Sequence, residues 1–202
     1  MMKSRKAELV QKFPSLQSDR LLLRKVLPED GDPLYRMLND PKVSRHISFR
    51  PETLSFPERL NRYFEDCNYT LSSLHFAIVL QEDRTFTFAG LCSYQHWNEK
   101  RGSASMGYMV LPEYWNRGIA TEAARLLLSF GFDDLELKAV YASCVSDNAP
   151  SQRVLIKCGF EPADKDRDGI GFPKREKRLG SSYVMTAEKR KKSEEGYTLL
   201  HK

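Results

Sequence analysis

The order of sequence patterns predicts an α+β, or mixed α/β, domain in which one sheet is covered by helices. Two observations support this class. A strand and two helices lead into a run of alternating, strand-like segments, and a strand–helix–strand–helix–strand order follows. The chain has 202 residues and no internal repeat, so we expect a single domain that buries its own core without a disulfide or a metal.

The first part of the chain holds two of the predicted helices. Over 28–39, Asp30 and Asp32 lie near the helix start, and Leu34, Met37 and Leu38 share one face. The strands that follow alternate in side-chain polarity, with a hairpin turn between the first two. In order, the predicted elements are a strand at 20–26, helices at 28–39 and 56–69, and strands at 74–80, 86–94 and 104–110, with the turn at 82–84.

Helices and strands alternate in the second part. Ala123, Leu127 and Phe130 face inward from the first of these helices, and Gly159 ends the second. The strand between them is apolar on both faces, as in the interior of a covered sheet. The predicted elements are helices at 119–132 and 150–158 and strands at 140–145 and 182–185, with a polar loop at 164–178.

Both ends of the chain differ from the middle. The first residues are charged and no apolar segment follows them, which excludes a secretory signal. The basic run at 189–192 indicates a solvated tail rather than a nucleic-acid arm. We therefore predict an N-terminal extension over 1–16, the domain over 17–187 and a charged C-terminal tail over 188–202.

Composition excludes several other classes of protein. Lys and Arg number 32 against 27 Asp and Glu, and the net charge of +5 is too small and scattered to indicate a DNA partner. No apolar run approaches the ~18 residues of a membrane span. The cysteines and histidines show no metal-ligand spacing, so we expect no bound metal and reduced thiols. These residues are Cys67, Cys92, Cys144, Cys158, His46, His75, His96 and His201. Without a membrane span or a secretory signal, we expect a soluble, cytoplasmic protein.

The segment 109–122, MVLPEYWNRGIATE, carries the strongest chemical signal. A strand ends at Pro112, and a helix begins near Ile119 after a short turn. Such a turn directs several backbone N–H groups at one point, where the helix dipole favours an anion, and Gly118 permits close approach. At ~1.5–3 kcal/mol for each charged hydrogen bond, three or four amides suffice for a pyrophosphate. An ordinary strand–helix junction is the alternative, because the GxGxxG and GxxxxGK[ST] patterns are absent.

Residues 114–123, YWNRGIATEA, resemble motif A of the Gcn5-related N-acetyltransferase (GNAT) superfamily, [QR]-x-x-G-x-[GA]. Trp115 stands where that motif has Gln or Arg, as in the ribosomal-protein N-acetyltransferase (RimJ/RimL-like) branch with its YWG[KR]GYATEA pattern. The resemblance covers about residues 17–186. Three further segments agree with the branch: SDRLLLR at 18–24, NDPKV at 39–43 and DNAPSQRVLIKCGF at 147–160, the last of which is similar to motif B.

This resemblance implies the acyl-CoA N-acyltransferase fold, with a mostly antiparallel sheet of about six to seven strands and a splayed parallel pair. Acetyl-CoA is then the cosubstrate and lies in the splay. Backbone amides of the turn would bind its pyrophosphate, and main-chain groups at the strand end would pair with pantetheine and stabilise the oxyanion. Asn148 would contact pantetheine, although it is also a good helix N-cap. The implied CoA-binding residues are Met109, Val110, Asn116, Arg117, Gly118, Ile119, Ala120, Thr121 and Asn148.

The resemblance also implies direct attack of a primary amine on the thioester. Many family members use a tyrosine as the acid, but this chain has Leu155 at that position. Ser151 is the candidate acid instead, with a helix-start hydroxyl that bonds backbone as the alternative. Ser105 stands where the branch often has Glu. His96 or Glu99, acting through water, is therefore the candidate base.

The leading hypothesis is an acetyl-CoA-dependent N-acetyltransferase whose acceptor is a protein N-terminal α-amine. Deprotonating an α-amine near pKa ~8 costs ~1.4 kcal/mol at neutral pH, against ~4–5 kcal/mol for a lysine-like amine. A small amine such as a polyamine, an amino acid or an aminoglycoside is the alternative acceptor. A non-catalytic CoA-binding regulator and an RNA-directed protein are the competing classes. We expect a monomer or homodimer with no membrane partner.

Overall fold

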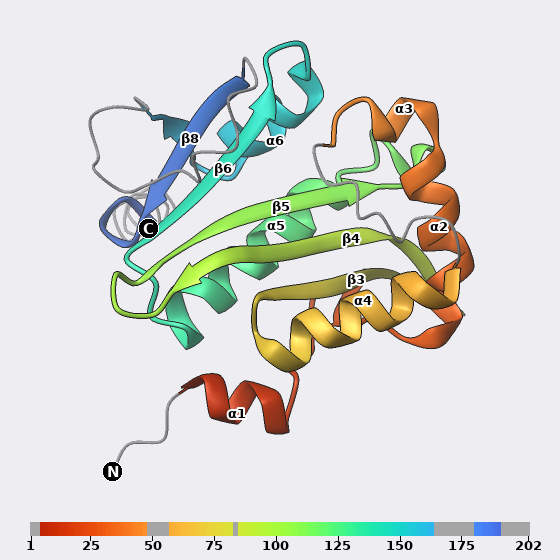
Figure 1. The fold of residues 1–202 in the computed structure, drawn as a ribbon. Helices are drawn as coiled ribbons and strands as arrows, with labels where there is room; N and C mark the ends of the chain where they lie inside the picture. Colours follow the sequence, from red (N-terminus) through yellow and green to blue (C-terminus); the bar gives the residue numbers. More distant parts are fainter. Residues whose placement is uncertain (1–4, 48–56, 83–84, 164–179, 191–202) are drawn as a thin grey trace.

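The computed structural model describes residues 5–47, 57–82, 85–163 and 180–190. In these ranges eight strands form one sheet in the order β1-β2-β3-β4-β5-β6-β8-β7 (Figure 1). Neighbouring strands are antiparallel except β5 and β6, which run parallel. The strands are β1 (Leu16–Gln17), β2 (Leu21–Lys25), β3 (Ser73–Glu82), β4 (Thr85–Asn98), β5 (Ser103–Val110), β6 (Ala139–Val145), β7 (Glu161–Pro162) and β8 (Gly180–Thr186).

The predicted α+β class is confirmed, and the sheet has one or two strands more than expected. The additional strands, β1 and β7, are two residues long and lie at the two edges of the sheet. A run of two residues shows no period-two alternation, so sequence patterns do not reveal it.

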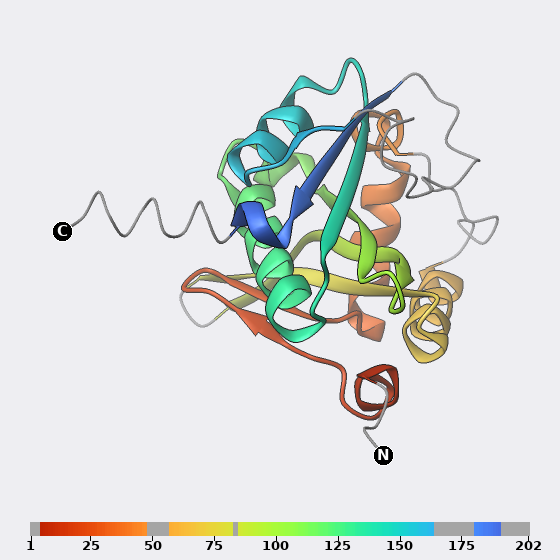
Figure 2. The same cartoon turned by 90° about the vertical axis from the view of Figure 1, so that its left-hand side faces the viewer.

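Helices cover both faces of the sheet, with α2 and α4 on one face and α5 and α6 on the other (Figures 1 and 2). No helix within the described ranges is long and apolar enough to cross a bilayer. The α-helices are α1 (Arg5–Gln11), α2 (Gly31–Asn39), α3 (Pro41–Ser44), α4 (Pro57–Thr70), α5 (Ile119–Ser129) and α6 (Ala149–Lys157). Two 3₁₀ turns are η1 (Pro28–Asp30) and η2 (Pro112–Tyr114), and η3 (Phe130–Asp134) is a π-helix.

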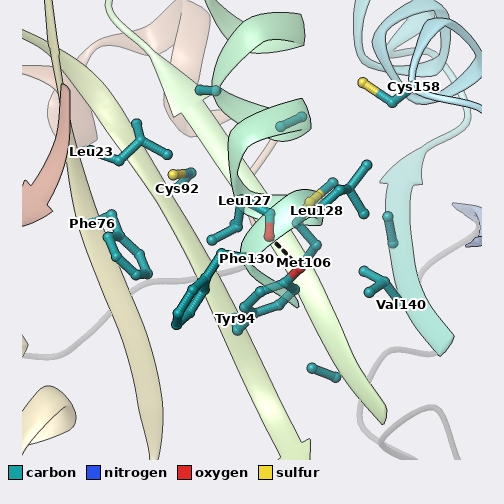
Figure 3. Close-up of a cluster of buried hydrophobic side chains, with 14 of the residues drawn as sticks. Leu23, Phe76, Cys92, Tyr94, Met106, Leu127, Leu128, Phe130, Val140 and Cys158 are labelled. Atoms are coloured by element: carbon teal, nitrogen blue, oxygen red, sulfur yellow. Dashed lines mark hydrogen bonds between the residues drawn. The ribbon is translucent and has the colours of Figure 1, made fainter. Parts of the chain in front are cut away.

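The larger part of the core lies between the sheet and α5. Figure 3 shows Leu23, Phe76 and Cys92 of neighbouring strands in one cluster with Leu127 of α5. Tyr94 is fully buried among them, and its hydroxyl donates a 2.8 Å hydrogen bond to the Leu127 carbonyl. The inward positions predicted for this helix are therefore confirmed, and the packing fixes α5 across the strands that end at the site described below.

The predicted helix 119–132 changes character before its end. The α-helix stops at Ser129 and continues as the π-helix η3, in which the Leu135 N–H bonds the Phe130 carbonyl at 3.0 Å. Gly131 lies in this segment directly over Tyr94, where a Cβ atom would come within 2.1 Å of the tyrosine oxygen. The close approach of the tyrosine requires glycine here.

The other face of the sheet packs against α2 and α4. Leu34 and Met37 of α2 and Phe64 of α4 are completely buried against Val79 and Leu91 of the sheet. Strand β3 therefore carries buried side chains on both faces, which makes it a central strand.

A residue before the predicted domain start packs against the core of the domain. Phe13, which precedes the predicted domain, packs its ring 4.8 Å from that of Phe76 in the core. The boundaries at 17 and 187 stay predictions. The loop predicted at 164–178 and most of the predicted tail lie outside the described residues, as do residues 83–84 of the hairpin turn.

Candidate active site

The parallel strands β5 and β6 separate soon after they meet. Their pairing covers three positions only, from Ser103 opposite Ala139 to Ser105 opposite Tyr141. Among the described residues, 106–110 of β5 have no ladder partner on the β6 side. The predicted splayed pair is therefore present, and a gap opens toward the carboxyl ends of the two strands.

A cavity of about 730 Å³ occupies this gap. Tyr108 on β5 and Cys144 on β6 line it from the two strands, and residues of the turn before α5 line it as well. The cavity brings together most of the predicted site residues from four elements. These are His96, Met109, Val110, Asn116, Gly118, Ile119, Ala120, Thr121, Asn148 and Ser151.

The turn before α5 presents backbone N–H groups without acceptors. Asn116 and Gly118 both adopt left-handed backbone conformations, with φ of 60° and 78°. The first N–H of the helix to reach a carbonyl is that of Glu122, which bonds the Gly118 oxygen at 3.0 Å. No residue in the described ranges accepts from the N–H groups of 116–121. Such a set of donors at a helix N-terminus suits an anion.

Arg117 contributes to this turn through its main chain alone. Its guanidinium forms an ion pair with Glu82 and lies 5.6 Å from the ring centroid of Tyr114. The side chain is absent from the described residues that line the cavity. A direct contact between this guanidinium and an anion in the turn is therefore not part of the arrangement.

A polar cluster that sequence reasoning missed supports the turn from behind. The Glu122 carboxylate accepts a 2.6 Å hydrogen bond from the Ser18 hydroxyl and a 3.0 Å bond from Arg20 Nε. Arg20 also donates to the Arg117 carbonyl at 3.4 Å. The sequence predicts a strand over SDRLLLR, and in the structure Ser18 and Arg20 also link this segment to the first turn of α5.

Trp115 holds the end of β5. Its indole Nε1 donates a 2.7 Å hydrogen bond to the carbonyl of Val110. The next N–H, that of Leu111, bonds the Ala89 carbonyl on β4 at 2.9 Å. Because successive N–H groups of a strand point to opposite sides, the N–H of Val110 points into the gap. Of the two main-chain groups of Val110, the carbonyl is engaged by the indole and the N–H faces the cavity.

Asn148 and Ser151 lie together at the start of α6. The Asn148 side-chain oxygen accepts from the Ser151 N–H at 3.2 Å, so Asn148 is the helix N-cap and also a cavity residue. The Ser151 hydroxyl lies 2.9 Å from that of Tyr108, a residue to which the sequence assigned no role. Leu155 is buried and lines the cavity one turn further along.

The two candidate bases differ in position. His96 is exposed, has a φ of 51° at an irregularity in the pairing of β4 with β5, and lines the cavity. Glu99 lies beyond the end of β4 in an exposed turn and is not among the described lining residues. The structure thus brings His96, but not Glu99, to the cavity.

A protein-family model described as "Acetyltransferase (GNAT) domain" matches residues 20–161, well over half of the chain. The chain belongs to the GNAT acetyltransferase family. The match spans the splayed strands, the turn and the whole of α6, so the cavity lies inside the family domain.

Individual relatives agree with this assignment. The GNAT chain is 29% identical over 177 residues to N-acetyltransferase p20 of Bacillus licheniformis, itself uncharacterized, with 87% of this chain and 97% of that protein covered. It is 32% identical over 148 residues to spermidine N(1)-acetyltransferase of Escherichia coli K12, covering 73% of this chain and 75% of that enzyme. Ribosomal-protein-S5-alanine acetyltransferase from Vibrio fischeri has the same fold, with a TM-score of 0.68 at 17% identity over 86% of this chain and 96% of that one.

These findings confirm the predicted acyl-CoA N-acyltransferase fold and the enzyme class. GNAT acetyltransferases take the acetyl group from acetyl-CoA, and this GNAT chain is an acetyl-CoA-dependent N-acetyltransferase. The donors of the turn and the gap between β5 and β6 fit such a cosubstrate, since they offer an anion site and an open strand edge.

Proposed function

We propose that acetyl-CoA binds with its pyrophosphate on the backbone N–H groups of residues 116–121 and its pantetheine along the open edge of β5. The observation that supports this placement is the row of six backbone donors with no acceptor in the described part of the chain. Met109, Val110 and Asn148 complete the site, and the N–H of Val110 is the candidate donor to the oxyanion.

For the chemical step, Ser151 is the proposed hydrogen-bond donor to the departing sulfur. The proposed base is His96, acting through water, because it lines the cavity. Glu99 is the weaker candidate, since a carboxylate outside the lining would need a longer water chain. The amine nitrogen forms the new bond to the carbonyl carbon, the carbon–sulfur bond breaks, and the amine proton passes to the base or to water.

The proposed acceptor is a protein N-terminal α-amine. The charges around the cavity support a peptide amine over a polyamine, because the cations Lys42 of α3 and Arg45 just after it line the cavity. Asp147 is the single carboxylate among the described lining residues. A polycation would meet like charges there, whereas a peptide brings one amine that is also easier to deprotonate.

A small amine is the second candidate acceptor, and the 32% identity to a spermidine acetyltransferase favours it. Thiol release from acetyl-CoA separates the candidates. The panel contains lysine-free hexapeptides that begin with Ala or Ser, the same peptides with a blocked N-terminus, spermidine and kanamycin. We expect release with the free peptides alone. Release with spermidine and not with peptides would contradict the proposed acceptor, and CoA binding without release would indicate a regulator.

A matched pair of variants tests the role of charge in acceptor choice. Arg45→Gln removes a cation that lines the cavity, whereas Arg36→Gln removes one that pairs with Glu113 outside it. We expect Arg45→Gln to lower the KM for spermidine or to create activity toward it, with no change for Arg36→Gln. Equal behaviour of the two variants would remove charge as the reason for acceptor choice.

We place this enzyme in the cytoplasm as a monomer or homodimer. All four cysteines are free and buried, which suits a reducing compartment. Size-exclusion chromatography with light scattering tests the oligomeric state, and fractionation of cells tests the compartment.

A further inference from the structure

A hydrogen bond between two hydroxyls crosses the gap between the splayed strands. Tyr108 projects from β5, and its oxygen lies 2.9 Å from the Ser151 hydroxyl and 3.1 Å from the Ser151 carbonyl on α6. Both residues are half-buried and line the cavity. The contact joins β5 to α6 at the residue assigned to the departing sulfur.

We propose that Tyr108 is a positioning residue that orients the Ser151 hydroxyl toward the thioester sulfur of acetyl-CoA. This inference rests on the proposed role of Ser151. The single phenolic proton has two acceptors on Ser151, the carbonyl and the hydroxyl oxygen. When Tyr108 donates to the hydroxyl oxygen, the serine proton must point to a different acceptor, and the cavity is where that acceptor lies.

Tyr108 keeps its proton in this arrangement. Burial raises the pKa of Tyr108 above its usual value of 10, and the contact with the Ser151 side chain offsets only part of that rise. Passing its proton on to a thiolate of ordinary pKa, ~8.5, would be uphill by more than one unit. The phenol therefore acts as a hydrogen-bond donor, and no bond to Tyr108 or Ser151 forms or breaks while the thiolate leaves and takes a proton from water.

The test is a double-variant cycle on the full chain. Tyr108→Phe, Ser151→Ala and the double variant are assayed by thiol release with acetyl-CoA, using an Ala-initiated hexapeptide and spermidine as acceptors. We expect Tyr108→Phe to lower kcat about tenfold with the KM for acetyl-CoA within twofold of the wild type. The double variant should be no slower than Ser151→Ala, because two groups that act as a unit are not additive. Tyr183→Phe, at another buried tyrosine near Tyr108, serves as the control and should keep kcat within twofold.

Each other outcome has a separate meaning. The positioning role is overturned if Tyr108→Phe has the kcat of the wild type. It is also overturned if Tyr108→Phe lowers kcat by the same factor in the wild type and in Ser151→Ala. Full activity of Ser151→Ala removes Ser151 from the chemical step and the inference with it. No thiol release by the wild type with either acceptor contradicts the proposed acceptors rather than the hydroxyl pair, and a KM increase with a lower melting temperature in Tyr108→Phe indicates a structural role only.

Discussion

The indole N–H of Trp115 donates a 2.7 Å hydrogen bond to the carbonyl of Val110, the last residue of β5. Trp115→Phe keeps an aromatic ring but deletes the donor, which costs about 1 kcal/mol at a buried carbonyl. We expect the Kd for CoA, measured by calorimetry, to rise about fivefold. Trp97→Phe, at the buried tryptophan outside the lining residues, is the control. An unchanged Kd in Trp115→Phe would show that the bond does not position β5 for CoA.

Gly118 offers a test of the anion site with a matched control. At a φ of 78°, Asn and Asp share a similar backbone cost, so Gly118→Asn and Gly118→Asp differ mainly in charge. A carboxylate ~5 Å from a phosphate charge costs about 3 kcal/mol at an effective dielectric constant of 20. We expect Asp to weaken CoA binding by about a hundredfold relative to Asn in calorimetry. Equal affinities of the two variants would place the pyrophosphate elsewhere.

Gly131 is a core glycine that is expected not to tolerate a side chain. In Gly131→Ala the new methyl would lie 2.1 Å from the Tyr94 oxygen and 2.8 Å from its Cζ. Overpacking of this kind costs ~1–3 kcal/mol, seen as a lower midpoint in urea unfolding. Gly107→Ala is the control, because its nearest neighbour would be Ser93 Oγ at 3.6 Å, an ordinary contact. Equal midpoints for the two variants would contradict the close packing of η3 on Tyr94.

His75 makes the free energy of unfolding depend on pH. His75 is 3% exposed, its Nε2 lies 2.7 Å from the Ser73 hydroxyl, and burial lowers the pKa of the imidazole to about 4. The unfolded chain binds a proton below pH ~6.5 while the folded protein does not, so this stabilisation is complete above pH 6.5 and is lost as the pH falls toward 4. The loss is about 2 kcal/mol at pH 5 and approaches ~3 kcal/mol at pH 4.

Urea unfolding at pH 7 and pH 5 measures this effect. The wild type is expected to lose stability between the two, and His75→Gln is expected to be less stable at pH 7 but to change less with pH. The same pH dependence in both proteins would assign the loss to other groups.

Long periodic segments could be predicted from the sequence, because packing against one core repeats at a fixed interval. The helix α5 is an example, since the inward positions Ala123 and Leu127 follow the helical period and are completely buried. Short elements such as α3 and β7 could not, because four or two residues do not complete a period. The π-helix that begins at Phe130 packs against Tyr94, a contact with a residue far away in the sequence.

For the site, the sequence revealed what is local and missed what folding brings together. The turn at 116–121 is contiguous, so its position between a strand and a helix, together with the resemblance to motif A, predicts an anion site from the sequence. The contact of Tyr108 with Ser151 joins residues 43 apart, and that of Arg20 with Glu122 joins residues 102 apart. Neither pair has a signal in a single sequence. The hydrogen bond from Trp115 to the Val110 carbonyl could not be predicted either, because the sequence shows only that Trp115 departs from the family motif.

The three-residue pairing of β5 with β6 has a thermodynamic consequence for the whole molecule. Strands β6 to β8 join the rest of the sheet through that short ladder, so a molecule that touches both β5 and β6 adds contacts that the folded chain lacks by itself. Binding at a hundredfold excess over Kd raises the free energy of unfolding by about 2.7 kcal/mol. In a cell rich in acetyl-CoA, bound cosubstrate would thus partly offset the loss of stability caused by substitutions in the last third of the chain. The full loss of stability would be measured when the cosubstrate is depleted.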